Sequence, residues 1–166
     1  MIEGETDMDE KALRDQLRRF LDWHEAHADF QAAFKDFPEK ERGKRPAGAA
    51  HSAWELLEHM RIATHDILEF SRDAQHKSPD WPSGYWPAKP APPSADAWDK
   101  SVKALEKDLR EMGKLVADPK TDLLARIGHG SGQTILREVL LIADHNAYHL
   151  GQFILVRQLL GCWPEH

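Results

Sequence analysis

Residues 134–161 have the sequence TILREVLLIADHNAYHLGQFILVRQLLG. Apolar side chains recur along this stretch at spacings near the helical period, namely Ile135, Val139, Ile142, Leu150, Phe153, Ile154 and Leu160. Gly161 is typical of the residue that follows the end of a helix, because glycine adopts a positive φ without a steric penalty. The stretch therefore predicts one helix over about 134–160.

Two histidines, His145 and His149, lie four residues apart in this predicted helix. Residues at that spacing project from one face of a helix, so both imidazoles can bind the same metal ion. Zinc peptidases use this spacing with a glutamate general base directly after the first histidine. Asn146 occupies that position here, which argues against a peptidase. The alternative is a pair of histidines that serves only the fold.

Three further segments show helical periodicity, over about 9–36, 52–76 and 94–117. Ser52 and Glu55 have the spacing of a capping box at the start of the second segment. Ser94 is a suitable N-cap for the third. No segment alternates with the period of a β-strand. We therefore predict an all-α protein, a four-helix bundle that forms a single domain over residues 1–166.

The stretch between the second and third segments, residues 79–93, is rich in proline and contains Trp81, Tyr85 and Trp86. Proline in such numbers is incompatible with a helix or a central strand. The aromatic rings predict a loop that packs on the body of the protein, and long ordered loops often cover functional sites. Its length also allows the second and third helices to run in the same direction.

The composition excludes several classes of function. The chain has 166 residues, a net charge of -6 and 41% hydrophobic residues. An acidic chain with scattered basic residues is a poor match for nucleic acid. No stretch has the roughly 18 apolar residues of a membrane span, and the acidic N-terminus does not resemble a signal peptide. With the single Cys162, which precludes an intrachain disulfide, these features lead us to expect a cytoplasmic protein that binds neither nucleic acid nor membrane.

A metal site needs at least one ligand beyond the histidine pair, and the segment over 52–76 offers His59. This histidine lies at the edge of an apolar stripe that includes Leu56, Met60 and Ala63. Ligands from facing helices are common in bundles. Three histidine ligands would leave a coordination position open for water or substrate, as in catalytic zinc sites.

Two motifs stand out, HSAWELLEH at residues 51–59 and HNAYHLGQ at residues 145–152. In the order and separation of these motifs, the chain resembles the DinB/YfiT-like family of metalloenzymes. The resemblance implies a four-helix bundle with a divalent transition metal, zinc or nickel, bound by His59, His145 and His149. It also implies a homodimer and a small-molecule substrate, which in some relatives is a low-molecular-weight thiol.

Two polar residues lie near the ligand face of the last helix. Gln152 can hydrogen-bond a metal-bound water or orient an imidazole, and the alternative is a surface or helix contact. For Glu138, the alternative role is to stabilise the first turn of this helix, where negative charge is favoured. Tyr148 points away from the ligands and suits packing or a dimer contact.

The remaining histidines are weaker candidates for a functional role. His24 and His27 could approach the site as a proton relay, but we favour solvated side chains. His129 lies among glycines and could line the mouth of the site. We expect His51 to fix the loop before the second helix, His65, His76 and His166 to lie on the surface, and Cys162 to be unreactive.

Two main hypotheses of function follow. The first is a metal-dependent enzyme with thiol S-transferase-like or metal-assisted hydrolase chemistry, in which the metal activates a bound thiol or water. The second is a non-catalytic metal-binding or stress-related dimeric bundle. A third possibility is a helical bundle without metal. No catalytic side chain is assigned from the sequence.

Overall fold

A computed structural model describes residues 3–21 and 26–164, with side chains from residue 9 onward. The α-helices in these ranges are α1 (Glu3–Leu21), α2 (Phe30–Phe34), α3 (Ala53–Arg72), α4 (Ala97–Ala117) and α5 (Ile135–Leu159). Two short 3₁₀ helices, η1 (Glu39–Glu41) and η2 (Ser83–Tyr85), lie in the connections. The described part of the chain has no β-strand, only an isolated bridge between Arg126 and Thr134. The all-α prediction is confirmed.

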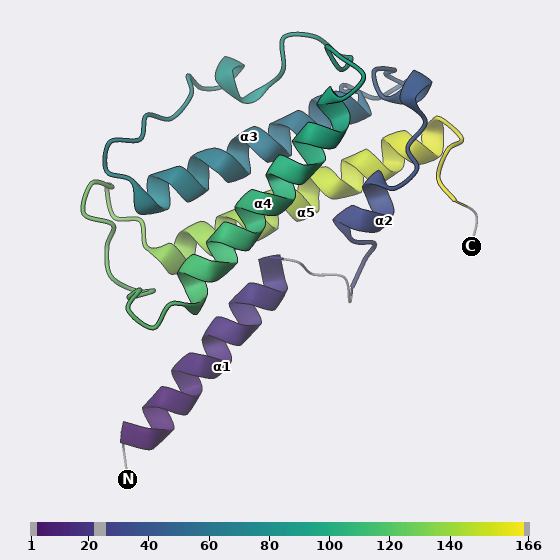
Figure 1. The fold of residues 1–166 in the computed structure, drawn as a ribbon. Helices are drawn as coiled ribbons and strands as arrows, with labels where there is room; N and C mark the ends of the chain where they lie inside the picture. The colour runs from purple at the N-terminus through teal and green to yellow at the C-terminus, as the bar shows by residue number, and fades with distance from the viewer. Residues whose placement is uncertain (1–2, 22–25, 165–166) are drawn as a thin grey trace.

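The bundle is built around α3, which packs against both α4 and α5, while α1 packs mainly against α4 (Figure 1). Helices α3 and α4 run in the same direction, and α5 runs opposite to both (Figure 1). The parallel pair is possible because the long connection that carries η2 returns along the length of α3. This topology places the middle of α3 beside the middle of α5.

The core at one end of the bundle is an aromatic cluster around Phe153 of α5. The ring centroid of Phe153 lies 4.9 Å from that of Phe34, 5.5 Å from that of Phe37 and 6.0 Å from that of Trp98. Edge and tilted arrangements of this kind are the favoured ones for aromatic pairs. The cluster joins α2, α4 and α5 at this end of the bundle.

The predicted capping box at the start of α3 is confirmed. The Ser52 hydroxyl accepts a hydrogen bond from the Glu55 amide at 3.2 Å, and the Glu55 carboxylate accepts one from the Ser52 amide at 2.8 Å. Arg45 forms an ion pair with the same carboxylate. The Ser52 hydroxyl also donates to the carbonyl of Pro90 at 2.6 Å, which ties the long loop to the start of α3.

The prediction of one continuous helix over about 9–36 is wrong. Helix α1 begins earlier, at Glu3, and ends at Leu21, and a separate short helix α2 begins at Phe30. The Asp29 side chain accepts a hydrogen bond from the Ala32 amide at 2.7 Å and so caps the new helix. An aspartate inside an apolar periodic pattern can compete for backbone amides in this way and start a second helix.

The other helix ends differ by a few residues. Helix α3 ends at Arg72 instead of about 76, because Asp73 has an extended backbone and accepts from the Gln75 amide. Ser94 does not cap α4, which begins at Ala97 after Asp96. Thr134 caps α5, and Gly161 has the positive φ expected after its end. Among the described helices, none combines the length and the apolar character needed to cross a membrane.

Candidate metal centre

The three histidines that the sequence singles out meet where α3 crosses α5. His59 comes from the first half of α3, and His145 and His149 come from successive turns of α5. One ring nitrogen from each residue lies within 4.8 Å of the others. The Nε2 atoms of His59 and His145 are 3.0 Å apart. His59 and His149 are buried, and His145 is partly exposed.

Hydrogen bonds fix the tautomers of two of these imidazoles. His59 Nδ1 lies 2.9 Å from the carbonyl oxygen of Tyr85, and His149 Nδ1 lies 2.8 Å from Oε1 of Gln152. An oxygen of either kind can only accept, so each Nδ1 carries the proton and donates it. The lone pair of each ring is therefore on Nε2, the atom left free to bind a metal.

The third imidazole is held more loosely. His145 Nδ1 lies 3.4 Å from Oδ1 of Asn146, and the Asn146 amide nitrogen donates to the Thr64 hydroxyl at 3.0 Å. The Nε2 atoms of His59 and His145, 3.0 Å apart, require a proton or a cation between them, because two lone pairs at this distance would repel. Tetrahedral zinc with bonds of 2.0–2.1 Å separates its ligating nitrogens by about 3.3 Å. The arrangement fits a shared divalent ion.

Burial keeps all three imidazoles neutral. Desolvation lowers the pKa of His59, His145 and His149 from the ordinary histidine value. For His149 burial is the largest cause, the neighbouring His145 adds to it, and the resulting pKa is about 4. Because a metal binds the neutral imidazole, these side chains are ready to act as ligands at neutral pH.

The lowered pKa of His149 predicts how the metal-free protein responds to acid. Between pH about 6.5 and about 4 the unfolded chain binds a proton at His149 that the folded chain does not bind. Stability therefore falls as pH decreases through this window and changes no further, for this group, below it. We expect His149→Gln to flatten the dependence of the unfolding free energy on pH, measured by urea denaturation in a chelator at pH 7, 6 and 5. An unchanged slope would contradict this reading.

Trp86, from the long loop, covers one side of the centre. Its ring stacks on His59 with centroids 3.9 Å apart and an interplanar angle of 3°. His51 stacks on Trp86 at 4.0 Å and 15°. The sequence predicted that this loop packs on the body, but it did not identify Trp86, His51 or the Tyr85 carbonyl as parts of the site. The only signal was the density of aromatic residues in the loop.

The other candidate residues differ in their burial and in whether they contact the histidine cluster. Gln152 contacts a proposed ligand, whereas Glu138 is buried in the first turn of α5 and accepts from Arg137 at 2.8 Å. Tyr148 is exposed, and its ring makes a T-shaped contact with His149, with centroids 4.8 Å apart. Burial raises the pKa of the Cys162 thiol, which disfavours the reactive thiolate.

Of the described residues, no further histidine joins the cluster, and His166 lies outside them. His129 Nε2 lies 2.7 Å from the carbonyl oxygen of Phe70, at the far end of α3 from His59. His27 is exposed beside the carbonyl of Ala28, and His24 lies outside the described residues. His76 was expected on the surface, but it is partly buried against Asp66.

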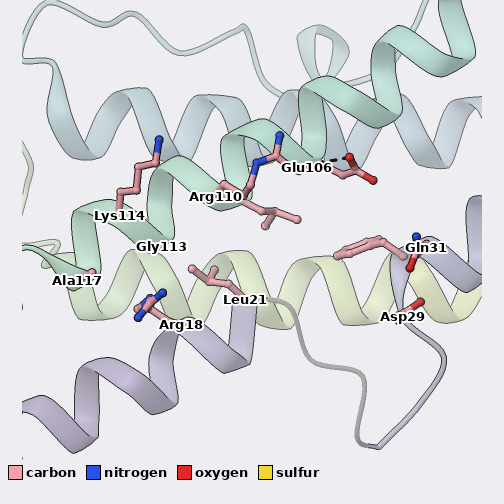
Figure 2. Close-up of a pocket in the computed structure, with 11 residues that line it drawn as sticks. Arg18, Leu21, Asp29, Gln31, Glu106, Arg110, Gly113, Lys114 and Ala117 are labelled. Carbon is pink, nitrogen blue, oxygen red and sulfur yellow. Dashed lines mark ion pairs between the residues drawn. The ribbon is translucent and has the colours of Figure 1, made fainter.

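A cavity of about 790 Å³ lies away from the histidines, between α1, α2 and α4 (Figure 2). Three cationic residues line it, Arg18, Arg110 and Lys114. Each has an acidic neighbour on its own helix: Asp15 at 3.7 Å, Glu106 at 3.8 Å and Glu111 at 2.7 Å, respectively. Local pairing leaves little excess positive charge to select an anionic ligand. The histidine cluster is the better candidate for the functional site.

Comparison with known protein families gives a match. The sequence model of the DinB superfamily matches residues 22–153, a range that includes all three histidines. No curated protein and no solved structure matches the chain at a significant level.

Proposed function

The chain belongs to the DinB superfamily, and from this premise we propose that it binds one divalent transition metal ion through His59, His145 and His149. The observation that carries the proposal is the convergence of three ring nitrogens within 4.8 Å. Two of the rings are oriented by hydrogen bonds that leave Nε2 free. The three ligands come from α3 and α5, the two helices at the centre of the bundle.

The donor set favours zinc or nickel. Neutral imidazole suits zinc, nickel and copper, whereas calcium and magnesium prefer oxygen ligands. Within the described ranges, the only group of three or more potential ligand residues consists of these histidines alone, without a carboxylate or a thiol. We therefore propose zinc or nickel as the resident ion.

We further propose that the centre is catalytic, with a small-molecule thiol or water as the nucleophile. Three protein ligands match the pattern of catalytic zinc sites, which keep a position open. A metal bound there would lower the pKa of a bound thiol or water and so supply a nucleophile at neutral pH. The chain's own residues hold the imidazoles: the Tyr85 carbonyl fixes His59, Gln152 fixes His149, and Trp86 shields His59 from water on one side.

Cobalt substitution tests this proposal. Cobalt(II) takes the place of zinc and reports its own coordination by visible absorption. We expect the cobalt-loaded protein to show the spectrum of a low-coordinate ion and to gain a sulfur-to-cobalt charge-transfer band when a small thiol such as 2-mercaptoethanol is added. Turnover is then sought with thiol acceptors and simple esters. A spectrum that no added thiol alters would mean that the site is closed, and would favour a metal-binding protein without catalysis.

The alternative is a non-catalytic dimeric bundle, and one surface bears on the oligomeric state that both hypotheses share. Helix α5 exposes Leu140, Tyr148, Leu155 and Leu159. Their spacings of eight, seven and four residues place them along one side of the helix. We propose that this face forms a homodimer contact, whichever hypothesis of function holds. Sedimentation velocity decides the point: a monomer at high micromolar concentration would refute it.

A further inference from the structure

A buried carboxylate lies two turns along α3 from His59. Asp66 is 8% exposed and is about 10 Å from His59 along the helix axis. It faces the ring of His76, with Nε2 at 2.7 Å from one carboxylate oxygen, and it accepts a hydrogen bond from the Tyr85 hydroxyl at 2.5 Å on the other. The proposed chemistry requires no carboxylate at this position. The role of Asp66 therefore lies in positioning the residues that it contacts.

Tyr85 connects this carboxylate to the histidine cluster. At one end its hydroxyl donates to Asp66, and at the other its backbone carbonyl accepts the Nδ1 proton of His59 at 2.9 Å. Burial and the Asp66 carboxylate raise the pKa of Tyr85 to about 12, so the hydroxyl remains protonated and able to donate. The next residue, Trp86, stacks on His59.

The loop has a second attachment beyond Trp86, where the Ser52 hydroxyl donates to the Pro90 carbonyl at 2.6 Å. Asp66 therefore holds the loop at Tyr85 and Ser52 holds it at Pro90, so Trp86 lies between the two attachments. This part of the loop supplies both the Tyr85 carbonyl that accepts from His59 and the Trp86 ring that stacks on His59.

We propose that Asp66 is a positioning residue for the metal centre: through the Tyr85 hydroxyl, it fixes the Tyr85 carbonyl and the Trp86 ring against His59. The ring of His59 then presents Nε2 to the ion with little loss of conformational freedom on binding. The inference rests on the proposed metal site. It adds a residue outside the two ligand motifs that contributes to the metal affinity of the site. Such supporting contacts typically contribute 10–100-fold to metal affinity.

The test is the zinc dissociation constant of the full-length chain, measured by competition with a chromophoric chelator. We expect Tyr85→Phe and Asp66→Ala each to weaken zinc binding by about 10–100-fold. Asp66→Asn should recover most of the affinity, because its amide oxygen can still accept from the Tyr85 hydroxyl. Tyr85→Phe removes one oxygen atom and is the variant least able to disturb folding.

Asp108→Ala is the matched control. Asp108 is 7% exposed and lies 2.9 Å from a ring nitrogen of His65, and no contact among the described residues joins it to the histidine cluster. We expect its zinc affinity to remain within about threefold of the wild type, whatever the cost to stability. Equal affinities in the wild type, Tyr85→Phe and Asp66→Ala would overturn the positioning role and leave the metal site intact. An equal loss in Asp108→Ala would also overturn it, and a wild type that binds no zinc would overturn the proposed function and this inference together.

Discussion

Replacing any one of His59, His145 and His149 with alanine is expected to weaken zinc binding by at least 100-fold. Losing a supporting contact typically costs 10–100-fold, and losing a ligand removes a coordinate bond as well. A 100-fold change corresponds to about 2.8 kcal/mol. The effect should be similar for the three residues, because their ring nitrogens converge on one point. Competition with a chelator of known affinity measures each dissociation constant.

His65→Ala provides the control for these variants. His65 lies on the same helix as His59, but its ring is half exposed and pairs with Asp108 at 2.9 Å. We expect wild-type zinc affinity from this variant. If His65→Ala and His59→Ala lost affinity equally, the binding would depend on histidine content or on general stability, and the cluster would not be a specific site.

The largest effect on stability is expected from Phe153→Ala. Phe153 is 0% exposed and makes ring contacts with Phe34, Phe37 and Trp98. Removing a buried phenylalanine typically costs about 3–5 kcal/mol, through lost burial and the cavity that remains. Urea denaturation of the metal-free chain measures the free energy of unfolding, which should fall by that amount.

Leu155→Ala, measured at a protein concentration low enough for the chain to be monomeric, is the matched comparison on the same helix. Leu155 is 53% exposed, and substitutions at exposed positions usually change stability by about 0.5 kcal/mol or less. If the two variants were destabilised equally, α5 would not be packed in the bundle as described. A larger loss for Leu155→Ala that depends on protein concentration would instead show that this face is buried in a dimer.

Much of the fold could be predicted because its signals are local. The Ser52 and Glu55 capping box and the glycine at 161 depend on contacts within a few residues, and both mark helix ends correctly. The spacing of His145 and His149 guarantees a shared helix face. The resemblance to the DinB family, carried by two short motifs, is confirmed by the family match over residues 22–153.

The features that the sequence missed depend on tertiary structure or on competition between local signals. Asp29 restarts a helix inside a run whose apolar period suggested continuity. Trp81 and Trp86 both lie in the proline-rich loop, and the sequence does not distinguish them. In the structure, Trp81 is exposed and Trp86 stacks on His59. The link from Asp66 through Tyr85 to His59 joins residues 19 and 26 positions apart. No periodicity reports such a contact, because it depends on how the loop folds back on α3.

The most direct test of the central claim is zinc K-edge X-ray absorption of the full-length chain, prepared without a histidine tag and loaded with one equivalent of zinc. We predict about three imidazole nitrogens at about 2.0–2.1 Å, with an additional oxygen from solvent and no sulfur. A shell that contains sulfur or lacks the imidazole scattering pattern would contradict the three-histidine centre, as would zinc that washes out on buffer exchange.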